Sequence, residues 1–132
     1  MLRVHKKIKY ALTSLKYMKG KKSGELTTAK EICTRFDIPF DPTSRVLQIM
    51  TQREILEAVQ GAYGGYRLAG DLSKYTLYDL SHMIVGPFAI TDCAEKGGEC
   101  ERIDKCILKE TMVKLNSKIL KVFRDVKISD MI

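Results

Sequence analysis

The sequence predicts a mainly helical fold with one small β-hairpin, namely a winged helix-turn-helix followed by a long C-terminal dimerisation helix. Three observations predict it. Amphipathic helical patterns come first, two short apolar runs around a glycine-rich turn follow, and a heptad-like apolar pattern occupies the C-terminal part. The length of 132 residues and the apolar fraction of 45% suit one domain with an added element.

The first helix is expected over residues 5–19. Ile8, Ala11 and Leu15 recur at intervals of three and four, as the buried stripe of a helix does, and Gly20 ends the pattern. Lysines lie between these apolar positions and are expected on the solvent side of the helix.

Positive charge is concentrated at this end of the chain. The net charge is +7, and the only acid among residues 1–30 is Glu25. A field of this sign favours a polyanion, most simply a nucleic acid. A solvated basic face would explain the charge alone equally well.

A shorter second helix is expected to begin near Thr27 and Thr28. Thr28 and Glu31 have the spacing of a capping box, in which each side chain accepts a hydrogen bond from the backbone N–H of the other residue. The expected buried face consists of Ile32, Cys33 and Phe36. We interpret this cysteine as a small core residue rather than a ligand, because it is far in sequence from the other three.

The third helix is expected to start with Asp41 as the N-cap and Pro42 at the first helical position. Its apolar side consists of Val46, Leu47, Ile49 and Met50. Its polar side consists of Ser44, Arg45, Gln48, Thr51 and Gln52. Such a face can bond base edges, since arginine prefers guanine and glutamine prefers adenine. The alternative is a solvated surface, but such a surface more often carries glutamate and lysine.

A β-hairpin is expected next. Residues 55–59 and 65–69 are short strand-like runs, and Gln60–Gly64 joins them with glycines that suit positive φ angles at the tip. Three helices followed by a hairpin is the order of a winged helix-turn-helix. In that fold the third helix enters the major groove of double-stranded DNA, and the wing touches the backbone or minor groove.

Two further helices are expected, one over residues 76–85 that ends at Gly86-Pro87 and one over residues 103–126. Apolar residues of the last helix step by four, three, four, three and four, at Leu108, Met112, Leu115, Ile119, Val122 and Val126. One small domain has little left to cover this stripe, which predicts a homodimer built on the helix. The alternative is a helix that packs only within its own chain.

Three of the four cysteines lie in the polar segment between these two helices. Cys93, Cys100 and Cys106 have the spacing C-x6-C-x5-C, with the pair Gly97-Gly98 inside the first gap. Thiolates are soft ligands that favour iron–sulfur clusters, zinc or copper(I). The spacing is that of neither common zinc sites nor bacterial ferredoxins, so the segment predicts metal ligation without naming the metal.

The chain is expected to be cytoplasmic. No run of about 18 apolar residues could cross a membrane, and the first residues lack the apolar block of a signal peptide. In a reducing compartment free thiols serve as ligands or redox groups rather than in disulfides. An enzyme is not expected, because no catalytic triad, phosphate-binding loop or paired-carboxylate arrangement is visible and His5 and His82 are the only histidines.

Several stretches resemble the bacterial IscR/NsrR family. They are Leu26–Ile32, Ile38-Pro39, Val46–Gln48, the wing Gln60–Ala69 and Tyr75–Leu80, and the Gly-Gly-Tyr-x-Leu of the wing is the most specific element. Together with the cysteine segment, the resemblance covers nearly the whole chain. Members of this family are dimeric winged-helix regulators, several of which bind an iron–sulfur cluster that reports iron–sulfur supply, nitric oxide or redox state.

The resemblance implies a dimeric transcriptional regulator, most commonly a repressor, that binds a palindromic operator in double-stranded DNA under control of its cluster. The implied cluster ligands are Cys93, Cys100 and Cys106. The implied base-reading residues are Ser44, Arg45 and Gln48, and the implied wing contacts are Gln60, Tyr63, Gly64, Gly65 and Tyr66. The expected organisation is a DNA-binding domain over residues 1–86, a cluster-binding loop over residues 87–106, and a dimerisation helix with a tail over residues 103–132.

Two positions depart from the family pattern. Lys109 stands where the assembly regulators have a histidine, and Lys9 stands where the nitric-oxide-sensing members have an aspartate ligand. Neither lysine is a credible iron ligand, so the fourth ligand is open among His5, an acid of the cysteine segment, and a small exogenous ligand or water. The first cysteine gap is also one residue longer than the common form, which leaves [2Fe–2S] and [4Fe–4S] both open. The alternative is a cluster-free redox sensor that uses thiols or zinc.

Overall fold

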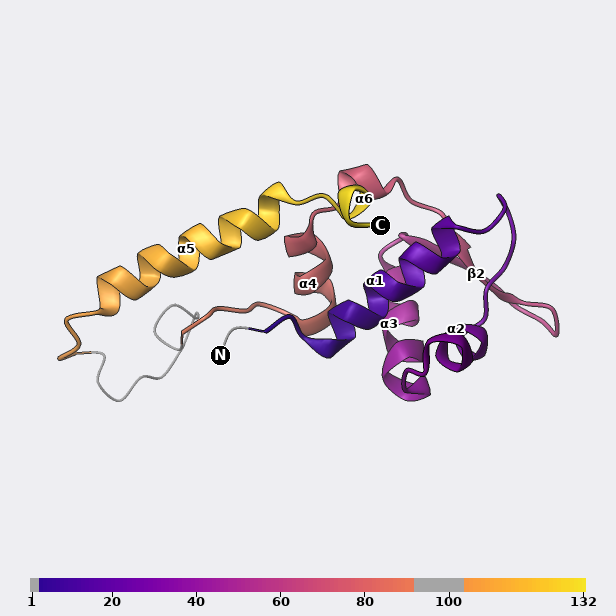
Figure 1. Ribbon diagram of the computed structural model, residues 1–132, viewed down its shortest axis with the longest axis horizontal. Helices are drawn as coiled ribbons and strands as arrows, with labels where there is room; N and C mark the ends of the chain where they lie inside the picture. The colour runs from indigo at the N-terminus through magenta and orange to yellow at the C-terminus, as the bar shows by residue number, and fades with distance from the viewer. Residues whose placement is uncertain (1–2, 92–103) are drawn as a thin grey trace.

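A computed structural model describes residues 3–91 and 104–132 of the chain (Figure 1). The helices are α1 (Lys6–Lys19), α2 (Ala29–Phe36), α3 (Phe40–Gln52), α4 (Leu77–Val85), α5 (Lys109–Asp125) and α6 (Ile128–Met131), with a 3-10 turn η1 (Leu72–Lys74). The strands are β1 (Leu56–Val59) and β2 (Gly65–Leu68). This mainly helical architecture with a two-stranded antiparallel hairpin confirms the predicted fold class.

The core lies where α1 contacts α3 and α4. Leu15 of α1, Leu47 of α3 and Leu80 of α4 are all fully buried in one cluster with Ile55, which precedes the hairpin. Burial of each such aliphatic side chain contributes about 1.5–3 kcal/mol, so this cluster is the main stabilising feature of the body. It holds α3 and the hairpin in fixed positions relative to α1.

The start of α2 differs from the prediction in one detail. Thr28 caps the helix as expected, because its hydroxyl accepts a hydrogen bond from the N–H of Glu31 at 3.1 Å. The Glu31 carboxylate does not complete the capping box. It accepts hydrogen bonds from Tyr17 and Lys21 of the α1 region instead. Phe36, expected in the buried face, is 40% exposed and packs edge-on against the Tyr17 ring.

The start of α3 also differs, because the helix begins at Phe40 with Pro39 as the N-cap. The prediction of Asp41 as N-cap and Pro42 at the first helical position was therefore wrong by two residues. Asp41 still lies in the first turn, where a carboxylate is favoured by the helix dipole. Pro42 lies there too, and its missing N–H removes no hydrogen bond because the first four N–H groups of a helix have no partner within it. The apolar side was predicted correctly, since Val46, Leu47 and Met50 are buried.

The hairpin confirms the two predicted strand-like runs. Leu56 pairs with Leu68 and Val59 pairs with Gly65 in an antiparallel register. A further bridge joins the hairpin to the segment before α2, because Tyr66 and Thr27 exchange two backbone hydrogen bonds of 2.8 Å. The wing is thus attached to the body through its second strand.

The helix α4 begins with a complete capping box that was not predicted. The Thr76 hydroxyl accepts from the N–H of Asp79, and the Asp79 carboxylate accepts from the N–H of Thr76. The helix ends at Gly86, whose φ of 81° suits a residue without a side chain. The predicted bounds of this helix and its glycine stop are therefore confirmed.

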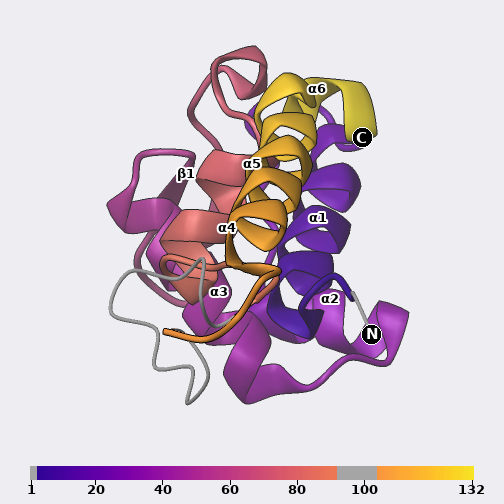
Figure 2. The ribbon, with the colours of Figure 1, turned by 90° about the vertical axis from the view of Figure 1, so that its left-hand side faces the viewer.

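The long helix α5 lies alongside α4 and extends away from the body (Figures 1 and 2). It begins at Lys109 and not at residue 103, since residues 104–105 and 107–108 form turns. After α5 the chain returns to the body, where Ile128 of α6 is fully buried. Backbone hydrogen bonds from Leu77 to Val126 (2.8 Å) and from Ile128 to Tyr75 (2.9 Å) fasten this return.

No helix within the described residues is long and apolar enough to span a membrane.

Candidate nucleic-acid interface and cysteine segment

The polar side of α3 presents hydrogen-bonding side chains to solvent. Arg45 and Gln48 are exposed and Ser44 is half-buried. Thr51 differs, because its hydroxyl donates to the carbonyl of Leu47 at 2.8 Å and so bonds its own helix. Arg45 and Gln48 lie one turn apart on an element whose opposite side is fixed in the core, so their backbone positions are set by packing.

Two of the predicted wing residues are exposed to solvent, and the other three are half-buried and have structural contacts. Tyr63 at the tip is 95% exposed and Gln60 is exposed, so these two side chains are available for contact. Gly61 allows the turn, with a φ of 113°. Across the strands Arg67 Nε donates to Glu57 at 2.9 Å, which ties β2 to β1.

The glycine pair and Tyr66 have structural tasks. A Cβ on Gly65 would lie 2.9 Å from the Thr27 carbonyl oxygen, and a Cβ on Gly64 would overlap the Val59 carbonyl oxygen. Tyr66 packs partly buried against the core while its backbone bridges to Thr27. Gly65 and Tyr66 let the wing approach the segment before α2, whereas Gly64 allows the close turn of the hairpin itself. These roles are sufficient to explain their presence.

The basic N-terminal region is less uniform than its charge suggests. Lys21 is largely buried and pairs with Glu31 at 2.5 Å and with Glu25 at 3.7 Å. Its ammonium also lies 4.9 Å from the centre of the Tyr17 ring. Lys21 is therefore structural, whereas Lys16 and Lys19 on α1 are exposed.

The side chains of Glu31, Lys21 and Tyr17 shift one another's pKa values. The Lys21 ammonium and the Tyr17 hydroxyl, which both donate to Glu31, hold the pKa of this carboxyl below its ordinary range. The hydrogen bond to Glu31 in turn raises the pKa of Tyr17. Burial by itself would lower the pKa of Lys21, but the hydrogen bond and charge of Glu31 raise it above its usual value. These contacts of Tyr17, Lys21 and Glu31 keep Glu31 and Lys21 charged and join the α1 region to α2.

Two of the three predicted ligands, Cys93 and Cys100, lie outside the described residues. Cys106 is described as a half-buried free cysteine shortly before α5. Cys33 is also free and half-buried, and its Sγ lies 3.7 Å from the Pro39 carbonyl oxygen. Cys33 therefore packs against the α2–α3 turn rather than lying fully in the core. Among residues 3–91 and 104–132, no three His, Cys, Asp or Glu side chains are grouped as a metal site.

The candidate fourth ligand His5 is the N-cap of α1. Its Nδ1 accepts a hydrogen bond from the Lys7 N–H at 3.2 Å, which leaves the Nε2 side of the exposed ring for another partner. Lys9 and Lys109 are both exposed. A donor set of three thiols and one imidazole, if brought together, would be chemically suited to iron.

The residues just before the cysteine segment are anchored to two helices. The Phe88 ring lies 5.6 Å from the Tyr78 ring of α4 and 5.6 Å from the Phe123 ring of α5. Asn116, the only buried residue of α5, accepts a hydrogen bond from the Ile90 N–H at 2.9 Å. Sequence reasoning missed these contacts. The available signal was Asn116 itself, a polar residue within an apolar helical pattern.

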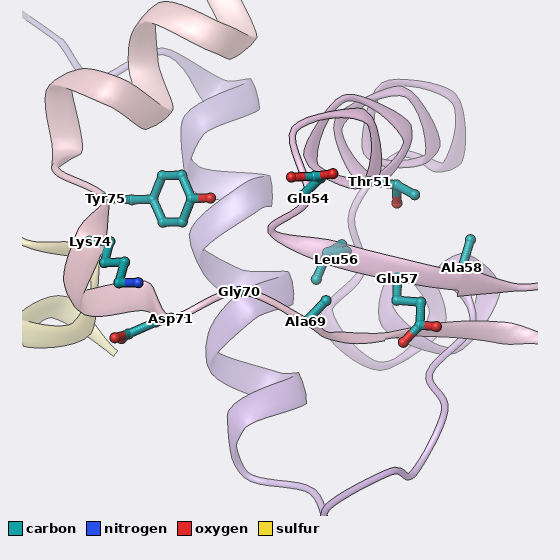
Figure 3. Close-up of a pocket in the computed structure, with 10 residues that line it drawn as sticks. All are labelled: Thr51, Glu54, Leu56, Glu57, Ala58, Ala69, Gly70, Asp71, Lys74 and Tyr75. Atoms are coloured by element: carbon teal, nitrogen blue, oxygen red, sulfur yellow. The ribbon is translucent and has the colours of Figure 1, made fainter.

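An open cavity of about 730 Å³ lies between the end of α3, the hairpin and η1 (Figure 3). Its carboxylates Glu54, Glu57 and Asp71 give it an acidic character that does not suit nucleic acid. Two of them have structural partners. Asp71 caps η1 by accepting from the N–H and hydroxyl of Ser73, which lowers the pKa of Asp71, and Glu57 pairs with Arg67.

Comparison with known proteins places this geometry among transcriptional regulators. The NsrR regulator of Oceanobacillus iheyensis is 27% identical over 124 residues, which cover 93% of this chain and 84% of that protein. The solved structure of CymR, the global cysteine regulator of Bacillus subtilis, matches with a TM-score of 0.73 at 20% identity and covers 99% of this chain and 96% of that chain. The IscR structure of T. potens matches with a TM-score of 0.70 at 18% identity and covers 98% of this chain and 85% of that chain.

These relatives are transcriptional regulators and not enzymes, as expected. The model of the Rrf2 family, described as iron-dependent transcriptional regulators, matches residues 4–132. The resemblance to IscR and NsrR is thereby confirmed. This chain belongs to the Rrf2 family of transcriptional regulators.

Proposed function

We propose that this protein is a cytoplasmic homodimeric repressor that reads a palindromic operator with α3 and the wing, and whose DNA binding is controlled by an iron–sulfur cluster. The observation that carries the DNA-binding part is the exposed pair Arg45 and Gln48 on a helix fixed by the core, in a chain of this family. Gln60 and the exposed Tyr63 would supply the wing contact.

Substitution of Arg45 tests the reading of bases. Arg45→Ala should weaken binding to the selected operator by roughly 1–3 kcal/mol and relax the base preference at one position of each half-site. Arg53→Ala is the matched control, because Arg53 is an exposed arginine at the C-cap of the same helix. The measurement is a binding-site selection followed by fluorescence anisotropy at fixed salt. If Arg45→Ala selects the same operator as the unmodified protein, Arg45 does not read a base.

Dimerisation is supported by the side of α5 that its own chain leaves uncovered. Leu108, the N-cap of α5, and Leu115 and Val122 within the helix are spaced by seven residues and are 52%, 42% and 59% exposed. Met112 and Ile119, which alternate with them in the predicted stripe, are half-buried. One side of the stripe therefore packs against the chain itself, and the other side is left uncovered for a second copy in this proposal. A second copy would place two α3 helices on half-sites about one DNA turn apart.

The cluster is supported by the chemistry of the donor set. Cys93, Cys100 and Cys106 offer three soft thiolates, and His5 is the candidate for the fourth position. In this proposal residues 1–86 bind DNA, residues 87–106 hold the cluster, and residues 103–132 dimerise. The cluster, when bound, supplies redox-sensitive bonds that cross-link the cysteine segment.

Contacts of the described residues indicate how a change in that segment would reach DNA. Phe88 and Ile90, which lead into it, are held by Tyr78 of α4 and by Phe123 and Asn116 of α5. Because α4 packs on α1 and α3, a displaced segment would alter the placement of the reading helix relative to α5. In a dimer, a small change of this kind alters the distance between the two α3 helices and so the affinity for an operator of fixed spacing.

Anaerobic purification tests the cluster. The protein should show visible absorption with matching iron and sulfide, and Ala substitution of Cys93, Cys100 or Cys106 should remove or greatly reduce that absorption. Cys33→Ala is the matched control and should keep the absorption, because the Cys33 thiol contacts the Pro39 carbonyl oxygen at the α2–α3 turn and is not among the proposed ligands. A triple variant that retains its colour would refute the ligand assignment.

A cluster-free sensor that uses thiols or zinc is the second candidate. It is favoured by the likeness to CymR, described as a global cysteine regulator. It predicts a colourless protein after anaerobic purification and attempted reconstitution, with DNA binding that responds to thiol oxidation. The absorption spectrum separates the two candidates.

A further inference from the structure

A mainly apolar cavity of about 290 Å³ lies between the start of α1, the middle of α4, the residues after α4 and the inner side of α5. Its apolar lining includes Val4, Ile8, Val85, Phe88, Ile119 and Phe123. These side chains come from four separate segments of the chain, so the cavity exists only in the folded protein. Its volume is at the lower end of the range for small-molecule sites.

Ser81 gives this cavity a buried polar group. Ser81 is one of the residues that line the cavity, it is fully buried, and its hydroxyl has no hydrogen-bond partner among the described residues. A buried hydroxyl without a partner costs about 1–3 kcal/mol. The hydroxyls of Thr27 and Thr43 are in the same state among the described residues, but only Ser81 lines this cavity. By contrast, the buried hydroxyl of Ser14 donates to the Tyr10 carbonyl oxygen at 2.8 Å.

The end of the cavity that is lined by the start of α1 is positively charged. Arg3 and His5 line it, and no acidic residue is present among its described lining residues. The first turn of α1 contains no acid either, so the positive end of the helix dipole is not neutralised within its own helix. An anionic group is favoured there.

We propose that this cavity binds a small organic monocarboxylate with an aromatic or branched aliphatic body. The apolar lining takes the body, Arg3 and the start of α1 attract the carboxylate, and Ser81 forms a hydrogen bond with an oxygen of the ligand. The site is lined in part by α4 and α5. A bound ligand would therefore affect how the two helices pack, and these helices also carry the proposed regulation. The proposal does not depend on the cluster.

A second copy of the chain is the other conceivable occupant, and the packing of α5 argues against it. Ile119 and Phe123, which line the cavity, are half-buried and face the body, whereas Leu115 and Val122 are the exposed apolar residues of this part of the helix. A partner helix is therefore expected on the exposed stripe and not in the cavity.

The test measures binding of phenylacetate to the full-length chain by isothermal titration calorimetry. Acetate is the probe without an apolar body, and 2-phenylethanol is the neutral probe of similar shape. We expect saturable binding of phenylacetate at one site per chain, weaker binding of 2-phenylethanol and no saturable binding of acetate. Arg3→Gln should remove the preference for phenylacetate over 2-phenylethanol.

Two serine variants separate ligand binding from folding. Ser81→Ala should weaken phenylacetate about five- to tenfold through loss of one hydrogen bond, while the thermal midpoint stays equal or rises, because an unpaired hydroxyl is removed. Ser14→Ala is the matched control and should leave the affinity unchanged. Ala89→Phe should abolish binding by filling the cavity.

Three results would overturn the proposal. The first is no saturable binding of phenylacetate. The second is binding that Arg3→Gln, Ser81→Ala and Ala89→Phe all leave unchanged. The third is an Ala89→Phe variant whose main effect is on the monomer–dimer equilibrium, which would show that a second copy fills the cavity. None of these measurements uses DNA or the visible absorption, so their failure is distinct from failure of the proposed function.

Discussion

At the scale of single residues, Glu31 illustrates the competition between local and tertiary hydrogen bonds. Its spacing from Thr28 suits a capping box, but its carboxylate bonds Tyr17 and Lys21. A bond to an ammonium and a phenol in a partly buried site is stronger than one to an exposed backbone N–H, because both partners are held in place and one is charged. Spacing along the sequence could predict Thr28 as a cap, since that contact is local. It could not predict that Lys21 would be brought close to Glu31.

Glu31→Gln should lower the free energy of unfolding by about 1 kcal/mol at neutral pH, a magnitude reduced by solvent because the carboxylate is 38% exposed. The pKa of Glu31 is lowered in the folded state, chiefly by Lys21 and then by Tyr17, so its stabilising contribution is complete above the ordinary Glu pKa. That contribution is lost as the pH falls below about 4.3 and through the folded-state pKa. The difference between Glu31→Gln and the unmodified protein should therefore shrink in acid.

Urea denaturation at several pH values checks this. Glu110→Gln is the matched control, because the Glu110–Lys114 pair is highly exposed and should contribute no more than about 0.5 kcal/mol. Equal effects of the two substitutions at neutral pH would show that the contacts of Glu31 do not stabilise the fold.

At the scale of elements, the sequence predicted the order and type of all the main helices and both strands. Long apolar patterns and strong stop residues such as Gly20 and Gly86 carry that information locally. The first residue of α3 was missed, because Asp41 and Pro42 are acceptable at several positions of a first turn. The start of α5 was missed because Leu108 continues the apolar period although its backbone lies outside the helix. The elements η1 and α6 are too short to leave a periodic signal.

The wing shows why a sequence motif can be specific without each of its residues touching DNA. Gly65→Ala should destabilise the protein by roughly 1–3 kcal/mol, because its Cβ would press on the Thr27 backbone at the bridge that holds the wing. Gly20→Ala is the matched control. The nearest atom to its Cβ would be 3.5 Å away and its φ is −75°, so it should be neutral or stabilising by up to about 1 kcal/mol.

Thermal or urea unfolding measures both glycine variants, and Tyr63→Ala completes the comparison. Tyr63 is 95% exposed, so its replacement should leave stability unchanged and reduce only operator affinity. If Gly65→Ala unfolded like the unmodified protein and instead lost DNA binding, Gly65 would serve the interface rather than the attachment of the wing.

At the scale of the whole molecule, contacts between distant segments were beyond sequence reasoning. After α5 the chain returns to the body, where backbone hydrogen bonds join Leu77 to Val126 and Ile128 to Tyr75. The apolar pattern of α5 does not predict this return. The same limit applies to the candidate sites. The exposed side chains of α3 could be predicted from helical period, whereas the burial of Ser81 in a cavity and the anchoring of Ile90 by Asn116 depend on how α4 and α5 pack.

The division of α5 into a covered and an uncovered side leads to a prediction about assembly. Replacement of Leu115 by glutamate removes an apolar contact worth roughly 1.5–3 kcal/mol, and a symmetric dimer contains this contact twice. Leu115→Glu should therefore raise the dimer dissociation constant at least about a hundredfold. Lys121→Glu, at an exposed position of the same helix away from the stripe of Leu108, Leu115 and Val122, is the control for charge and should leave the dimer intact.

Sedimentation equilibrium over a range of concentrations measures the dissociation constant, and anisotropy with whole operators and isolated half-sites measures the consequence for DNA. Loss of the dimer should reduce affinity for the whole operator far more than for a half-site, because two linked reading helices bind with an effective concentration that a monomer lacks. A Leu115→Glu protein that remains fully dimeric would place the interface elsewhere. A monomeric unmodified protein at all concentrations would remove the homodimer from the proposal and leave the exposed stripe of α5 to a different partner.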